Sequence, residues 1–79
     1  NFIVVQKDEL KGVINKNGKM ITTCKYGFIK ELNQNLLKVY LKDYGVIDKN
    51  GKEILPCEYR DIKYVKENRI FLCLKKKHS

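Results

Sequence analysis

The sequence predicts an all-β fold of antiparallel hairpins and meanders repeated with a 33-residue period. Sliding the 79-residue chain on itself by 33 residues aligns 13 identities over the 24 positions that begin at Gly12 and Gly45. Each copy has an Asn-Gly pair between short apolar runs, which indicates a hairpin because both residues tolerate positive φ. No stretch keeps the 3.6-residue apolar period of a helix. A 33-residue period is typical of repeat architectures, so we expect either a short repeat array or a small open barrel.

The repeat divides the chain into four parts of a single β-repeat domain. Residues 1–10 are the end of a preceding, partial copy, and Phe2 to Val5 form its strand. The first repeat covers residues 11–43 and the second covers residues 44–77, while a basic tail occupies residues 75–79. Because repeat units bury their cores against neighbours, the chain is expected to be either a piece of a longer array or a compact minimal version.

Each repeat is predicted to open with a hairpin. In both copies an aliphatic pair precedes the turn and an apolar segment follows it, with the turns at residues 15–18 and 48–51. Asp48 starts the second turn, where its side chain is expected to hydrogen-bond locally rather than to act as an acid or base.

The segment after each hairpin, at residues 26–29 and 59–62, is either a short strand or a turn. Both segments begin with a tyrosine, Tyr26 or Tyr59. A tyrosine repeated at one position is expected to be a core residue with its hydroxyl at the rim.

Each repeat is also predicted to close with a strand. In the first repeat Leu37, Val39 and Leu41 are spaced two residues apart, which predicts a strand with one buried face. In the second repeat residues 70–74 are apolar on both faces, which predicts a strand covered on two sides. Polar connectors, which should form turns, precede these strands at residues 33–35 and 66–69.

These residues resemble the WG (KWG) repeat family of bacterial β-repeat proteins. Residues 44–74 follow the order of its unit, with Tyr44-Gly45 standing where Trp-Gly is usual and with the later Pro56 and Tyr59 in place. Residues 11–41 match more loosely, because Lys11 stands at the Trp position. The resemblance implies an interaction or structural module with no shared catalytic residue.

The cysteine and histidine content argues against an enzyme, a metal site or a cofactor. Cys24, Cys57 and Cys73 are an odd number with no C-x-x-C pair, and the single histidine is His78. This pattern fits neither a zinc site nor a disulfide framework. Free thiols in a reducing compartment are expected, with Cys24 and Cys57 as small buried side chains.

The composition predicts a cytoplasmic protein of bacterial or phage origin. No apolar run approaches the roughly 18–20 residues of a membrane span. The chain has 15 Lys, two Arg and no Ala, which is the bias of an AT-rich genome. Its net charge of +8 therefore combines compositional drift with whatever charge serves a function.

The most specific site prediction is a basic ridge that binds a partner. Its six lysines occupy equivalent places in the two repeats: Lys16, Lys19, Lys30, Lys49, Lys52 and Lys63. Such a ridge would attract phosphate or an acidic protein surface, whereas the same lysines could simply solvate turns and protect strand edges.

Two functions follow from these features. The first is a non-catalytic module that mediates protein–protein interaction or scaffolding, with an unidentified protein partner. The alternative is a small basic β protein that binds nucleic acid or inhibits a nucleic-acid-handling complex, as an inhibitor from a phage or mobile element would. Phosphate binding depends steeply on salt and an apolar interface does not, which separates the two. The sequence leaves the oligomeric state open.

Overall fold

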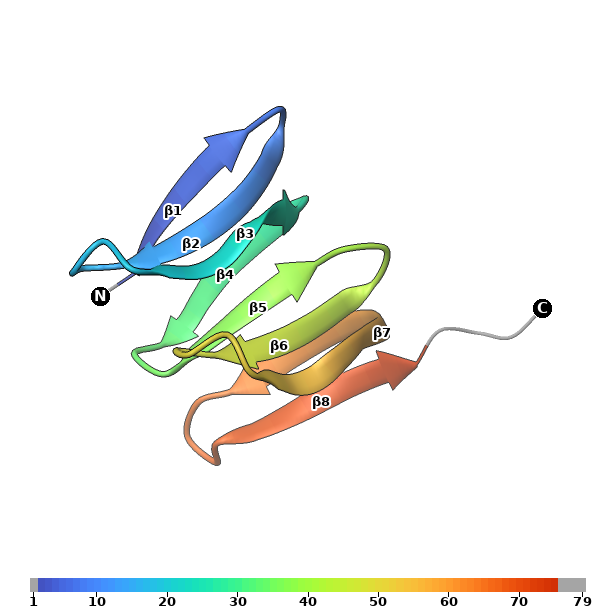
Figure 1. Cartoon of the computed structure of the whole chain (residues 1–79). Helices are drawn as coiled ribbons and strands as arrows, with labels where there is room; N and C mark the ends of the chain where they lie inside the picture. Colours follow the sequence, from blue (N-terminus) through green and yellow to red (C-terminus); the bar gives the residue numbers. More distant parts are fainter. Residues whose placement is uncertain (1, 76–79) are drawn as a thin grey trace.

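The computed structural model describes residues 2–75, and every regular element in that range is a β-strand (Figure 1). The strands in chain order are β1 (Phe2–Lys7), β2 (Leu10–Asn15), β3 (Met20–Tyr26), β4 (Phe28–Asn33), β5 (Leu36–Tyr40), β6 (Tyr44–Asp48), β7 (Glu53–Val65) and β8 (Ile70–Lys75). They form a sheet of order β1-β2-β3 and a sheet of order β4-β5-β6-β7-β8. All pairs are antiparallel and both sheets are open, which confirms the all-β repeat prediction.

The described part of the chain contains no helix long and apolar enough to cross a membrane. Residues 76–79 of the predicted basic tail, together with His78, lie outside the described residues. Lys75 is the last residue of β8.

The two opening hairpins have the same register. Lys11 pairs with Tyr26 between β2 and β3, and Tyr44 pairs with Tyr59 between β6 and β7. The register then shifts at the same two places in both hairpins. Each shift is a β-bulge, which bends the longer strand across its partner.

The bulges explain why both repeats carry a glycine after the first residue of the hairpin. A Cβ atom on Gly12 would lie 2.7 Å from the carbonyl oxygen of Thr22. A Cβ atom on Gly45 would lie 2.8 Å from the carbonyl oxygen of Leu55 and 2.8 Å from the Sγ of Cys57. These distances are too short for any side chain, so each bulged strand requires a glycine in the partner strand that it crosses.

Both hairpin turns are closed by the side chain of their first residue, Asn15 or Asp48. The Oδ1 atom of Asn15 accepts hydrogen bonds from the amides of Asn17 at 2.9 Å and Lys19 at 3.0 Å. Asp48 makes the equivalent two bonds in the second turn, both at 2.8 Å. The carboxylate of Asp48 is therefore a turn-forming group, as expected.

The second turn packs against the first repeat. Gly18 and Gly51 both have positive φ, 83° and 85°. A Cβ atom on Gly51 would lie 2.6 Å from the carbonyl oxygen of Ile21, whereas one on Gly18 would meet no atom within 4 Å. Glycine is thus needed at both turns for conformation, and at Gly51 also for the contact between repeats.

The boundary between the two sheets falls at Gly27, between β3 and β4. In the second repeat the equivalent segment, residues 59–62, lies within the continuous strand β7. It stays in one strand because β8 extends far enough for Lys75 to pair with Tyr59. In the first repeat β5 ends at Tyr40 and the chain bends toward β6, so no such partner exists for Tyr26. The segment that the sequence left open is therefore two strands in one repeat and one strand in the other.

The prediction that Leu41 continues the buried face of β5 is wrong. Leu41 lies in the bend after Tyr40 and is 50% exposed. Its amide donates to the carbonyl oxygen of Asp43 at 3.1 Å, which turns the chain toward β6. Leu37 and Val39 are fully buried, as predicted.

The main core joins the two repeats. Its buried residues are Val13, Tyr26, Leu37, Val39 and Ile47. They come from both sheets, so the second repeat completes the core of the first. Tyr26 is 6% exposed and is the core residue that its repeated position predicts, whereas its counterpart Tyr59 is only half-buried.

Candidate interaction surfaces

Strand β8 forms the outer edge of the five-stranded sheet, and its pairing differs from that of its counterpart β5. Ile29 of β4 pairs with Val39 of β5, whereas the equivalent Ile62 pairs with Cys73 rather than with Leu72. The bulge that shifts the register lies near the end of β4 in the first repeat and in the middle of β7 in the second. A one-residue slip exchanges the two faces of a strand, so Leu72 points away from the face that carries Ile62.

The outward face of β8 is apolar and exposed, which corrects the prediction of a strand covered on both sides. Ile70, Leu72 and Leu74 are 47%, 53% and 55% exposed. Two of their counterparts in the first repeat, Leu37 and Val39, are fully buried, and the third, Leu41, is 50% exposed in the bend after β5. The difference arises because β5 lies between two strands and under the main core, whereas β8 is the last strand of its sheet.

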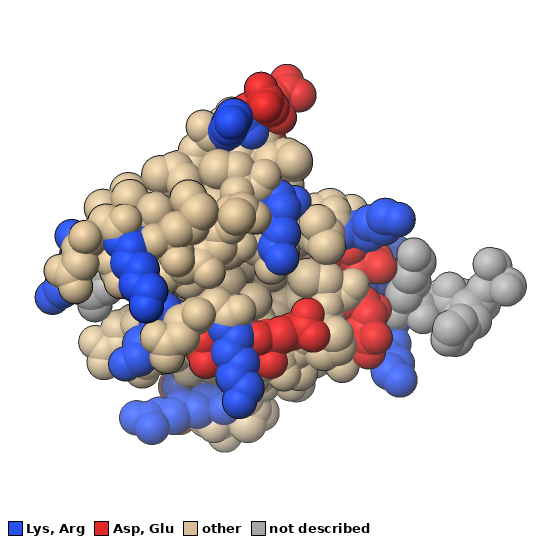
Figure 2. Space-filling model, in the orientation of Figure 1, with Lys and Arg blue, Asp and Glu red and all other residues tan. Residues whose placement is uncertain are grey.

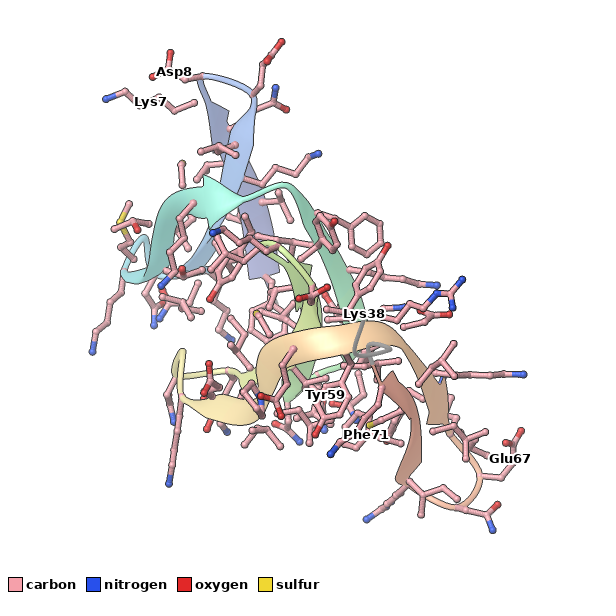
Figure 3. All side chains as sticks on the ribbon, turned by 90° about the vertical axis from the view of Figure 1, so that its right-hand side faces the viewer. Lys7, Asp8, Lys38, Tyr59, Glu67 and Phe71 are labelled. Carbon is pink, nitrogen blue, oxygen red and sulfur yellow. The ribbon has the colours of Figure 1, made fainter. Side chains whose placement is uncertain are left out.

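The bend of β7 covers the face of β5 and β6 that points away from the main core. The Nζ atom of Lys38 on β5 lies 3.0 Å from Oδ1 of Asp61 on β7, although β6 separates these strands in the sheet. Figure 3 shows the bent strand β7 passing beside Lys38. Val46 and Ile62 lie under this bend and are only 0% and 1% exposed, although they do not belong to the main core cluster.

Tyr44, which stands where the WG unit has Trp, is held in an aromatic group. Its ring lies 5.9 Å from that of Phe28, edge to face, and 4.8 Å from that of Tyr40. The Nζ atom of Lys38 lies 4.5 Å from the centre of the Tyr44 ring. Ring–ring and cation–π contacts thus occupy the base of the second hairpin.

The Lys38–Asp61 pair was missed at the level of sequence. Hydrogen bonds from Lys38 and from the amide of Ile62 lower the pKa of Asp61 below its ordinary value. Asp61 is equivalent to Phe28 in the first repeat, so the internal repeat could not indicate the pair. Only the bend of β7 over β5 brings the two side chains together.

The six predicted ridge lysines are all exposed. Lys16 and Lys49 line one hollow of about 520 Å³, and Lys30 and Lys63 line another of about 430 Å³. In the view of Figure 2, basic side chains are spread over the surface with acidic ones between some of them. Lys19 and Lys52 line neither of these two hollows, and a ridge that joins all six lysines stays a prediction.

The cysteines of the described chain are free thiols. Cys24 and Cys57 are half-buried and Cys73 is exposed. Within residues 2–75 no group of three or more His, Cys, Asp or Glu side chains is placed to hold a metal ion. Burial, and to a smaller extent the negative charge of Glu53, raises the pKa of the Cys57 thiol above its ordinary value.

This environment predicts that Cys57 reacts slowly with thiol reagents. At neutral pH the exposed Cys73 should be alkylated by iodoacetamide at least roughly tenfold faster than Cys57, because the thiolate is the reactive form. Mass spectrometry of peptides from a timed reaction measures both rates. Because the pKa of Cys57 is raised in the folded state, deprotonation of this thiol favours the unfolded chain. The stability of the protein should therefore fall as the pH rises above the pKa that the thiol has in the unfolded chain. Comparable rates for Cys57 and Cys73 would contradict the burial.

The geometry therefore defines a class of protein, an open all-β module of two tandem repeats that share a core. The model of the WG containing repeat matches the chain twice, at residues 12–43 and 44–77. The chain belongs to the WG repeat family. A search of curated proteins and a search of solved structures each gave no match.

Proposed function

We propose that this WG repeat module is a non-catalytic protein-interaction or scaffolding unit whose β8 edge binds an extended segment of a partner protein. The observation that carries this function is the exposed apolar row of Ile70, Leu72 and Leu74 on an edge strand. Natural proteins usually cover or charge such an edge, because its unpaired backbone groups are open to pairing. The match to a repeat module, rather than to a catalytic family, supports a non-enzymatic role.

The pairing of the first repeat supports a particular kind of partner. In the first repeat the closing strand β5 has the opening strand of the next hairpin, β6, paired along its edge. The equivalent edge of β8 has no strand beside it within residues 2–75. The partner is therefore a β-hairpin or strand with apolar side chains at every second position, which adds to the sheet by backbone hydrogen bonds.

A peptide with the sequence of residues 44–65 tests this function, because it contains the hairpin that pairs with β5. The labelled peptide should bind the intact protein in a fluorescence anisotropy titration. Leu72→Lys should weaken binding by about tenfold or more, because it places a charge in the apolar row. The matched control is Leu41→Lys, which changes another half-exposed leucine in the bend after β5. Equal loss in both variants, or no binding by the parent chain, would contradict the proposal.

The same titration distinguishes the nucleic-acid alternative, which rests on the net charge of +8. Strand addition to an apolar edge should change little with salt. Binding to phosphates should fall steeply and linearly when log affinity is plotted against log salt concentration. A mixed-sequence DNA that binds with this dependence, in a chain that does not bind the hairpin peptide, would favour the alternative.

A further inference from the structure

Three turns lie at one end of the molecule around an open hollow of about 520 Å³. The turns join β2 to β3, β4 to β5 and β6 to β7, so the hollow exists only where two repeats follow each other. The close contact of Gly51 with the backbone of Ile21 fixes the second turn against the first repeat. The volume falls within the range of small-molecule sites, about 300–1,000 Å³. The polar residues of the turns that line it are Lys16, Asn17, Gln34, Asn35, Lys49 and Asn50.

The charge of the hollow is positive. Lys16 and Lys49 are equivalent residues of the two repeats, and the packing of the turns places both on the same hollow. No carboxylate is among its lining residues. Within residues 2–75 the structure records no salt bridge at either lysine. The site therefore favours an anion over a cation or a neutral molecule.

The hollow also contains unused hydrogen-bonding groups. The side-chain amides of Asn17, Gln34, Asn35 and Asn50 make no hydrogen bond to any other described residue. The Oδ1 atom of Asn15 is used by its turn. Each amide offers both donors and an acceptor, so the set matches a ligand that carries hydroxyl groups as well as negative charge.

One side of the hollow is apolar. Phe2 and Ile21 line it, and both also pack against the main core. A sugar ring has carbon–hydrogen faces that fit such a surface, while its hydroxyls reach amide groups around it. A bare inorganic anion would use the lysines and the amide donors, but neither the amide acceptors nor the apolar side.

We propose that this hollow between the repeats binds a small anionic sugar, which carries either a phosphate or a carboxylate group. The two lysines bind the charged group, the free amides hydrogen-bond to the hydroxyls, and Phe2 contacts the ring. The site is separate from the β8 edge. Its ligand binding and the strand addition at β8 can therefore fail independently.

Titration of the intact, ¹⁵N-labelled protein tests the site at near-physiological salt. The probes are glucose 6-phosphate and glucuronate, compared with glucose and inorganic phosphate. At least one anionic sugar should shift the amide signals of residues 15–18, 34–35 and 48–51 at up to about 10 mM, which corresponds to weak but specific binding. Glucose and phosphate should each bind about tenfold more weakly than that sugar, because each lacks half of the recognised groups. The relative affinities of the two sugars identify the preferred anionic group.

A pair of double variants separates a defined site from general charge. Lys16→Gln with Lys49→Gln should weaken binding by about tenfold. The matched control, Lys30→Gln with Lys63→Gln, removes the same charge from repeat-equivalent lysines that do not line this hollow, and should change affinity by less than about twofold. Circular dichroism shows whether each variant is folded. The proposal is overturned by the absence of shifts with both anionic sugars, by phosphate binding as tightly as they do, or by equal loss in both double variants.

Discussion

Gly45→Ala is expected to destabilise the protein by about 3 kcal/mol or more, at the upper end of the cost of overpacking. The added Cβ atom would lie 2.8 Å from the carbonyl oxygen of Leu55 and 2.9 Å from the amide nitrogen of Cys57. Both are backbone atoms, so no side-chain rotation relieves the clash. A core of this size supplies about 3–5 kcal/mol in total. The variant should therefore be largely unfolded at temperatures where the parent chain is folded.

Gly27→Ala is the matched control for this prediction. A Cβ atom on Gly27 would lie 3.7 Å from the nearest atom, which is in the Tyr40 side chain, so it makes an ordinary contact. The expected change in unfolding free energy is within about 0.5 kcal/mol. Thermal unfolding followed by circular dichroism measures both variants. If Gly45→Ala melts within a few degrees of Gly27→Ala, the predicted clash between a Cβ atom at position 45 and the backbone of β7 is contradicted.

Leu37→Ala is expected to cost about 2–5 kcal/mol, the usual cost of removing a fully buried leucine side chain. Leu37 lies in the core cluster together with Val13 and Ile47, so the cavity opens between the repeats. The repeat-equivalent substitution, Ile70→Ala, should cost only about 1 kcal/mol or less, because Ile70 is already 47% exposed.

Urea denaturation of both variants measures this difference. The comparison is well matched because the two positions are 33 residues apart and carry similar aliphatic side chains. Similar losses at Leu37 and Ile70 would mean that β8 is covered in solution, which would contradict the exposed edge. Addition of the hairpin peptide should make Ile70→Ala more costly, since the peptide covers that face.

Local features of the sequence predicted the hairpins and turns. The pairs Asn17-Gly18 and Asn50-Gly51 lie where both turns form, and their glycines adopt the positive φ that these turns impose. Asp48 closes its turn through bonds to residues two and four positions later. Such features depend on neighbouring residues alone, and a single sequence contains them.

The position of a bulge was not predictable in the same way. Residues 70–74 are apolar on both faces, so their pattern does not specify which face points inward. The bulge in β7 decides it, and pairs Ile62 with Cys73. In the first repeat a charged Lys38 and a buried Val39 distinguish the faces of β5, and there the predicted burial of Leu37 and Val39 was confirmed, although that of Leu41 was not.

Contacts between distant segments were also outside the reach of the sequence. The hollow combines three turns, and the Lys38–Asp61 pair depends on the bend of β7. The internal repeat identified Lys16 and Lys49 as equivalent residues. It did not indicate that the turn at Gly51 packs against Ile21 and so places both lysines on one hollow.

Hydrogen exchange of the backbone amides of β8 tests the interaction module most directly. In the free protein, the β8 amides that do not donate to β7 should exchange much faster than those of β5, which is paired along both edges. With the peptide of residues 44–65 bound, the amides of Ile70–Lys75 should become protected while those of β1, an edge strand of the other sheet, stay unchanged. Unchanged exchange in β8, or protection that appears at β1 instead, would contradict strand addition at this edge.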